Sequence, residues 1–273
     1  MATPDLLVPG GLDPALLERG HVRVEQYGSL LRVTLDRPDA RNAQTPATWT
    51  ALAAVGDVVL GSPEIDAVVL SGSGPSFSAG LDRRMFTPEG IPGEMSLLSL
   101  ARAGDEELEE SIAAAQAAFT WWRACDAITF ALVQGHAIGA GFQLALACDI
   151  LIAAPDAQFA MRETSYGLVP DLAGTSTLVR AVGHARALEI CATGRSVSAE
   201  EAYRLGLVTR IHENLDDAAE EMLAALGAAP PGAVRELTRL LRDAHERTAE
   251  EQRAAERRAQ SRRLRSLLAA IEG

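Results

Sequence analysis

The 273-residue chain contains no lysine, and all 25 of its basic residues are arginine. This absence excludes chemistry that needs a lysine amine, namely Schiff-base formation, the P-loop phosphate site and a Ser-Lys dyad. Asp and Glu together number 37, so the formal net charge is −12. The acidic balance argues against nucleic acid or an anionic membrane as a partner, and any polyanionic ligand has to be held by arginine or backbone amides.

Other common signatures are missing as well. The three cysteines, Cys125, Cys148 and Cys191, are far apart and lie in apolar runs, which is typical of buried small side chains and not of disulfides or a zinc site. No apolar run reaches the roughly 18 residues that cross a bilayer, and the start lacks the pattern of a signal peptide. We therefore expect a cytoplasmic protein with no metal and no membrane partner.

Hydrophobic patterning predicts an α/β fold with parallel strands, because buried strand-like runs alternate with helical segments. A hairpin is expected around Gly28, strands at residues 67–70, 128–133 and 149–154, and helices at about 45–60, 105–124, 142–148, 175 onward and 198–206. We predict a loose leader at residues 1–20, a core at 21–205 and a helical lobe at 206–273. Residues 83–104 contain Gly and Pro with little periodicity, which predicts a mobile loop.

Two loops of small residues follow strand-like runs, at residues 77–82 (FSAGLD) and 135–141 (GHAIGAG). Small residues let backbone N–H groups approach a ligand atom closely. Ala140 lies at the start of a predicted helix, where an unpaired amide and the helix dipole both favour an anion. We predict that the amides of Ala79 and Ala140 donate to a single oxygen and stabilise an oxyanion. The alternative is two tight turns without a ligand, since Gly-x-Gly alone is weak evidence.

Two carboxyl groups and one amide are candidates for the accompanying chemistry. Glu163 and Asp171 lie eight residues apart in loop-like sequence with apolar neighbours, which raise carboxyl pKa values and suit proton transfer. Gln143 lies one turn after Gly139 on an apolar helix; it can donate a hydrogen bond but cannot act as a base. The structural alternatives are that Asp171 caps the next helix and that Glu163 pairs with an arginine.

Together these motifs resemble the crotonase, or enoyl-CoA hydratase/isomerase, family over about residues 20–265. The segments that carry the resemblance follow one another in the family's order, at residues 35–43, 77–82, 135–149 and 199–208. The resemblance implies a crotonase-like spiral of ββα turns with a helical C-terminal lobe, assembled as a homotrimer or as a hexamer of paired trimers. It also implies an acyl-CoA thioester as substrate and no cofactor. The carbonyl oxygen of the thioester would accept hydrogen bonds from the amides of Ala79 and Ala140.

The acid positions depart from the usual hydratase pattern of this family. Glu163 falls on one of two glutamate positions, and Gln143 falls on the other. Asp171, eight residues after Glu163, resembles the family's dienoyl-CoA isomerases, in which such a pair moves a proton along a conjugated chain. Three hypotheses remain: an isomerase that uses Glu163 and Asp171, with Gln143 auxiliary; a hydratase or 3-enoyl to 2-enoyl isomerase that uses Glu163 alone; and a non-catalytic acyl-CoA binder.

The negative charge of CoA requires local positive charge in so acidic a protein, and arginine binds phosphate through forked hydrogen bonds. The residues that we expect to contact CoA lie in or beside the first motifs: Arg41, Ala79, Leu81, Asp82 and Arg83. A second group of arginines on the last helix fits phosphate binding and subunit pairing equally well: Arg253, Arg257, Arg258, Arg262, Arg263 and Arg265.

Overall fold

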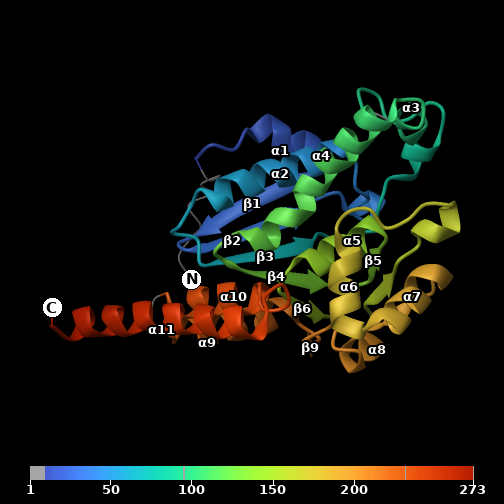
Figure 1. The fold of residues 1–273 in the computed structure, drawn as a ribbon. Coiled ribbons are helices and arrows are strands. Elements are labelled where there is room, and N and C mark those ends of the chain that lie inside the picture. The colour runs from blue at the N-terminus through green and yellow to red at the C-terminus, as the bar shows by residue number, and fades with distance from the viewer. Residues whose placement is uncertain (1–9, 95, 231, 273) are drawn as a thin grey trace.

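The computed structural model describes residues 10–94, 96–230 and 232–272, and its centre is a six-stranded sheet (Figure 1). The strand order is β1-β2-β3-β4-β6-β9. β1 pairs antiparallel with β2, as the predicted hairpin requires, and the pairs from β2 onward are parallel. The strand bounds are β1 Val22–Tyr27, β2 Leu30–Leu35, β3 Ala67–Gly72, β4 Ile128–Val133, β6 Ile150–Ala153 and β9 Arg210–Ile211.

Successive side chains of the central strands point to opposite faces of the sheet, and each face has its own hydrophobic core. In β3, Val68 and Leu70 pack into the larger cluster, whereas Ala67 and Val69 join a smaller one on the other face. The larger cluster lies under α1 (Pro14–Gly20), α2 (Pro46–Leu60) and α4 (Asp105–Ala124), and α9 (Leu215–Gly227) covers the smaller one (Figure 1). Each fully buried aliphatic side chain contributes about 1.5–3 kcal/mol, so both layers hold the sheet firmly.

A second, three-stranded sheet and several short helices lie beyond the carboxyl ends of the parallel strands. This sheet has the order β5-β7-β8 and follows directly from the loop after β4. Its strands are β5 His136–Ile138, β7 Gln158–Ala160 and β8 Val197–Ser198. The helical elements around it are η1 Pro38–Ala40, η2 Arg83–Phe86, α3 Leu97–Leu100, α5 Ala140–Ala147, η3 Glu163–Tyr166, α6 Gly174–Val182, α7 His184–Thr193 and α8 Ala199–Arg204.

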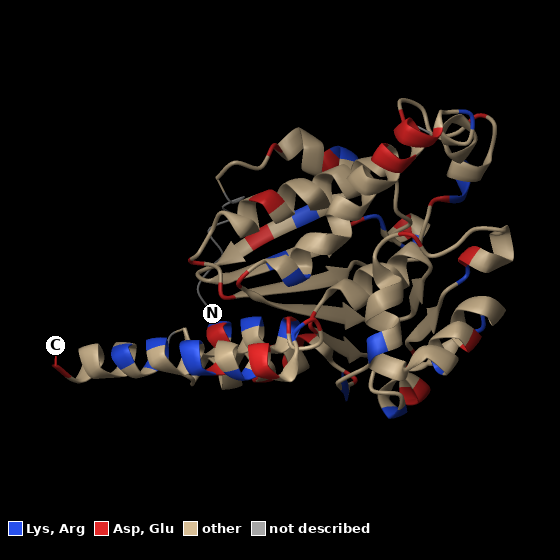
Figure 2. Ribbon diagram, viewed as in Figure 1, with Lys and Arg blue, Asp and Glu red and all other residues tan. Residues whose placement is uncertain are grey.

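The C-terminal helix α10 (Ala233–Arg242) attaches to the amino-terminal ends of the parallel strands, and α11 (Ala249–Glu272) packs on α10 and projects away from the body (Figure 1). α10 makes this attachment through arginines. Arg242 forms an ion pair with Asp149 and donates to the carbonyl oxygens of Cys125 and Ala127. Figure 2 shows charged residues of both signs along α9, α10 and α11. None of the helices in the described ranges is long and apolar enough to cross a membrane.

Three expectations about organisation need correction. The predicted loose leader is wrong for residues 12–20, because Leu12 and Leu17 are buried and α1 packs on α2; residues 1–9 lie outside the described part. The core does not stop at residue 205, because β9 at Arg210–Ile211 is hydrogen-bonded to β6. The segment 83–104 is better anchored than predicted: it contains two helical turns, and the Glu94 carboxylate accepts from the amide of Ala47 at 2.9 Å.

Candidate active site

The two small-residue loops meet backbone to backbone where β3 and β4 end. Gly80 has a φ of +85°, and a Cβ atom there would lie 2.3 Å from the carbonyl oxygen of Ile138 and 3.5 Å from the nitrogen of Ala140. Gly141 is equally constrained, since a Cβ atom would lie 2.5 Å from the carbonyl oxygen of Ser78. Only glycine permits so close an approach, so small residues in both motifs bring the loops into contact.

The prediction that the Ala79 amide donates to an oxyanion is wrong, and the free amide of this loop belongs to Leu81. The amide of Ala79 donates to the carbonyl oxygen of Arg41 at 2.8 Å, so it is already occupied. Two residues on, the amide of Leu81 has no acceptor among the described residues. The loop that carries Arg41 supports this conformation, because the Ser78 hydroxyl donates to the carbonyl of Asn42 at 2.8 Å and accepts from Gln44 at 3.1 Å.

The second donor position is Ala140, the first residue of α5. Gly139 precedes it with a φ of +52° and donates to the carbonyl oxygen of Ala160 at 2.8 Å, which turns the chain into the helix. The amide of Ala140 has no hydrogen-bond partner in the described chain. Every residue of α5 is buried, so the helix is held rigidly behind this amide. The amides of Leu81 and Ala140 are therefore both free on two loops that touch, and their donation to one shared oxygen stays a prediction.

The Glu163 carboxyl group lies directly beside the second loop. A Cβ atom on Gly139 would lie 3.3 Å from Glu163 Oε1. Oε1 accepts a hydrogen bond from Gln143 Nε2 at 2.8 Å, whereas Oε2 is buried and has no partner among the described residues. Burial raises the pKa of Glu163, and the nearby Asp171 charge raises it further. The expected alternative of an arginine partner is wrong within the described ranges, because the side chain bonds to Gln143 instead.

Asp171 lies on the segment between η3 and α6, near enough for its charge to act on Glu163. Its side chain remains accessible to solvent, yet the surrounding protein atoms raise its pKa. Its carbonyl oxygen accepts from Gln116 Nε2 at 2.6 Å. Asp171 does not cap α6: the residue before that helix is Ala173, and no side chain caps it. The carboxyl group of Asp171 is therefore available to a ligand.

Gln143 is the link between the two acid-bearing segments. Its side chain is 1% exposed and extends from α5 toward both of them. Besides its bond to Glu163, it accepts from the amides of Leu172 at 2.9 Å and Gly174 at 3.4 Å. The position that could have carried a third acid thus carries a neutral amide that is hydrogen-bonded through both its nitrogen and its oxygen.

The residues expected to contact CoA separate into two groups. Arg41 and Arg83 are exposed beside the first loop, and neither forms an ion pair with another described residue. Asp82, in contrast, is buried and paired with Arg84 at 2.8 Å and Arg37 at 2.7 Å. Its hydrogen bonds to Arg84 hold its pKa far below the usual range. Its carboxylate is occupied in fixing the loop, so direct contact between that carboxylate and CoA is not supported.

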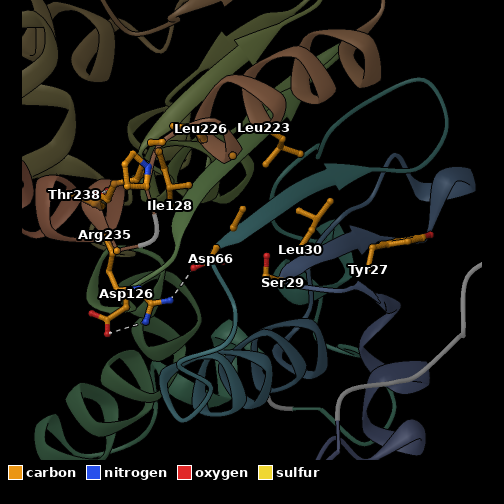
Figure 3. Close-up of a pocket in the computed structure, with 16 residues that line it drawn as sticks. Tyr27, Ser29, Leu30, Asp66, Asp126, Ile128, Leu223, Leu226, Arg235 and Thr238 are labelled. Atoms are coloured by element: carbon orange, nitrogen blue, oxygen red, sulfur yellow. Dashed lines mark hydrogen bonds and ion pairs between the residues drawn. The ribbon is translucent and has the colours of Figure 1, made fainter. Parts of the chain in front are cut away.

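The C-terminal arginines lie far from this chain's own site, because α11 projects from the opposite end of the sheet (Figure 1). Arg253 and Arg257 pair with Glu250, and Arg262 pairs with Glu236. The same end holds a pocket of about 340 Å³ between the sheet, α9 and α10, in which Arg235 reaches Asp66 and Asp126 (Figure 3). None of the predicted site residues lines this pocket.

Comparison with known proteins supports the family that the motifs indicate. The sequence model described as enoyl-CoA hydratase/isomerase matches residues 25–267. The protein named "Probable enoyl-CoA hydratase echA8" of Mycobacterium bovis is 34% identical over 182 residues, which are 66% of this chain and 63% of that protein. The chain thus spans slightly less than two thirds of that relative. Carnitinyl-CoA dehydratase of Salmonella enteritidis PT4 is 33% identical over 231 residues, covering 82% of this chain and 81% of the relative.

Solved structures agree with the sequence relatives. A protein of Thermobifida fusca YX, crystallised in complex with acetoacetyl-CoA, is 40% identical with a TM-score of 0.87, covering 94% of this chain and 99% of that one. An enoyl-CoA hydratase from Polaromonas sp. JS666 is 31% identical with a TM-score of 0.78, covering 89% and 91%. The fold is therefore the mixed α/β fold of these proteins, and the chain belongs to the enoyl-CoA hydratase/isomerase family.

Proposed function

We propose that this protein is an acyl-CoA isomerase that shifts a carbon–carbon double bond, with Glu163 and Asp171 as its proton-transfer groups. The observation that carries the proposal is that Gln143 joins the segments of the two acids, donating to Glu163 and accepting from the amides of Leu172 and Gly174. Burial also raises the pKa of each acid. The neighbouring Gln143 cannot take up a proton. A site with two such acids suits the removal of a proton at one carbon and its return at another.

In the proposed reaction, the thioester carbonyl oxygen accepts from the amides of Leu81 and Ala140. Deprotonated Glu163 takes a proton from the acyl chain on its Oε2, and the electron pair of the broken C–H bond moves through the conjugated system onto the thioester carbonyl oxygen. Asp171, which begins the cycle protonated, then gives its proton to a more distant carbon; the electron pair returns from the carbonyl oxygen to form the new C–H bond, and the double bond has moved. Glu163 releases its proton to solvent and Asp171 takes one up, which restores the starting state. One oxyanion donor typically contributes about 3–4 kcal/mol to the stability of the transition state.

The proposed ligand is a CoA thioester, supported by the acetoacetyl-CoA complex of the Thermobifida fusca protein. In this lysine-free chain, the exposed guanidinium groups of Arg41 and Arg83 are the candidates for the CoA phosphates. Both arginines lie beside the loop that supplies the Leu81 amide. The CoA phosphates and the thioester oxygen would therefore be bound by two loops that are hydrogen-bonded to each other through the Ala79 amide and the Arg41 carbonyl.

A second candidate function is hydration of an enoyl-CoA, or 3-enoyl to 2-enoyl isomerisation, with Glu163 acting alone. The names of the relatives favour it, since they include a hydratase and a dehydratase. Purified protein is incubated with 3,5-dienoyl-CoA, and the conjugated product is followed by absorbance. Turnover of 3,5-dienoyl-CoA supports the two-acid isomerase. Brisk hydration of 2-enoyl-CoA with no turnover of 3,5-dienoyl-CoA rejects the two-acid isomerase. Binding of CoA esters with no turnover on any of these substrates would indicate a non-catalytic binder.

We also propose that the chain self-associates through α11, as a homotrimer or a hexamer. Four large apolar side chains on its last turns are each more than half exposed: Leu264, Leu267, Leu268 and Ile271. Their spacing places them on one helical face, and a monomer leaves that face in water. Sedimentation velocity tests this proposal: a single 28.9-kDa species would contradict it, and glutamate at Leu267 and Leu268 should dissociate the assembly.

A further inference from the structure

We infer that Gln143 is the positioning residue of this site: it selects which oxygen of Glu163 moves the proton and keeps the Asp171 segment aligned with it. The inference rests on the proposed function, because it concerns the same proton transfer. Gln143 has this role because both polar atoms of its side chain, Nε2 and Oε1, form hydrogen bonds to the acid-bearing segments.

The first step concerns the oxygen atoms of Glu163. An amide NH₂ group can only donate, so the 2.8 Å bond from Gln143 Nε2 keeps Glu163 Oε1 as an acceptor in either protonation state. A proton on this carboxyl group therefore resides on Oε2. Oε2 is buried and has no partner among the described residues. The bond to Gln143 thus reserves Oε2 for substrate.

The second step concerns the other end of the same side chain. Gln143 Oε1 accepts from the amides of Leu172 and Gly174, which lie one and three residues after Asp171. A Cβ atom at Gly174 would lie 2.7 Å from Gln143 Cγ, so this segment packs closely against the glutamine. Since α5 is buried along its whole length, the amide has a fixed base. One rigid side chain therefore fixes the positions of Glu163 and the Asp171 segment relative to the Ala140 amide, which lies on the same helix as Gln143.

Two substitutions separate the donor role of the Gln143 side-chain amide from its acceptor role. In Gln143→Glu, the oxygen that accepts from Leu172 and Gly174 is retained, but a carboxyl group replaces the donor next to Glu163. Two carboxyl groups at that distance titrate as a pair and must share a proton. In Gln143→Leu, donor and acceptor are both lost. The bond from Gln143 normally lowers the pKa of Glu163, so its loss raises that pKa.

The experiment measures kcat and KM across pH on the purified full chain, with 3,5-dienoyl-CoA as the probe. Glu163 must be deprotonated to accept a proton, so a raised pKa moves the acidic limb of the kcat profile to higher pH. We expect the limb in Gln143→Glu to lie at least about one pH unit above that of the unmodified protein, with Gln143→Leu between them. In Gln143→Leu, kcat should fall about 10- to 100-fold with KM within about threefold, because positioning is lost and ligand binding is not.

Gln252→Leu is the matched control. Gln252 is also a partly buried glutamine that bonds through both polar atoms, accepting from Arg247 at 3.0 Å and donating to the carbonyl oxygen of Leu240 at 3.3 Å, but it lies on α11 and touches neither Glu163 nor the Asp171 segment. We expect an unchanged acidic limb and a kcat within about threefold of the unmodified protein. Circular dichroism and thermal melting establish that each variant is folded. If Gln143→Leu does not fold, Gln143→Glu, which keeps the size and the acceptor, decides the question.

The outcomes distinguish this inference from the proposed function. If Glu163→Gln keeps full activity, the proposed function fails. If Glu163→Gln is inactive while both Gln143 variants keep the limb of the unmodified protein, a purely structural role is shown and the inference is overturned. A shifted limb in Gln143→Glu together with the kcat loss in Gln143→Leu supports it.

Discussion

Different interactions stabilise the structure at the two ends of the central sheet. At the carboxyl end, the candidate site depends on backbone contact between glycine loops and on the buried, uncharged amide of Gln143. At the amino end, α10 is fastened to the sheet by arginine–aspartate pairs, of which Arg242–Asp149 is nearly buried and Arg239–Asp126 is largely exposed. Contacts of the first kind define atomic positions and are insensitive to salt, whereas exposed ion pairs are weakened by it.

Glu163→Gln at the carboxyl end is expected to have the largest effect. General acid–base catalysis typically contributes about 10²–10⁴-fold, so kcat should fall at least about 100-fold with the fold intact. Asp171→Asn is the companion variant: a comparable loss supports the two-acid isomerase, and near-normal activity supports Glu163 acting alone. Steady-state kinetics on 3,5-dienoyl-CoA and 2-enoyl-CoA measure both.

Glu163→Gln should also raise the free energy of unfolding at neutral pH. Burial raises the pKa of Glu163, so the folded state binds its proton more tightly than the unfolded state does. Ionisation of Glu163 therefore costs no stability below the unfolded pKa; the cost develops as pH rises from the unfolded pKa to the folded pKa and stays constant above it. We expect Glu163→Gln to have a higher Tm than the unmodified protein at pH 8 and an equal one at pH 4. An equal or lower Tm at pH 8 would contradict this.

Arg242→Ala tests the amino end. Removing one partner of a nearly buried ion pair typically costs about 3–5 kcal/mol, because Asp149 is left unpaired. Arg239→Ala, on the same helix face but exposed, should cost less than about 1 kcal/mol. Urea denaturation measures both. Equal losses would show that burial does not separate the two pairs.

Gly80→Ala tests the backbone contact between the loops. The added methyl group would clash with the carbonyl oxygen of Ile138, so the loop must move and the Leu81 amide with it. We expect kcat to fall about 100-fold, the typical cost of a lost oxyanion donor. Gly93→Ala is the control: its φ of +79° is similar, but no atom of the other described residues lies within 4 Å of the added methyl group. Activity within about threefold is expected there.

The smallest effect is expected at the rim of the site. Phe86 follows the oxyanion loop and Tyr166 lies on the same turn as Glu163, and their rings pack 5.3 Å apart. An aromatic pair of this kind contributes about 0.5–1.5 kcal/mol. We expect Tyr166→Ala to change the ratio of kcat/KM between short and long acyl chains by about two- to tenfold, with kcat on the short substrate retained. An unchanged ratio would place the pair outside the acyl path.

Local signals predicted much of the fold. The helices at residues 46–60 and 105–124 follow from Thr45-Pro46 and from the acidic first turn at Asp105, and both have these bounds in the structure. The strands of the second sheet were not predicted. They are only two to three residues long, and so short a segment carries no periodicity. The leader was misjudged because Leu12 and Leu17 are buried by α2, which lies later in the chain.

The amino-acid sequence by itself determined the family, the two glycine loops and the acids Glu163 and Asp171, because small residues and carboxyl groups are chemical properties of single positions. Only the tertiary structure decided that Leu81, and not Ala79, has a free amide, since the carbonyl of Arg41 comes from a distant segment. It alone also joined Gln143 to Glu163, Leu172 and Gly174. Whether a polar group is free or bonded depends on what folding places beside it, and no single position in the sequence encodes that.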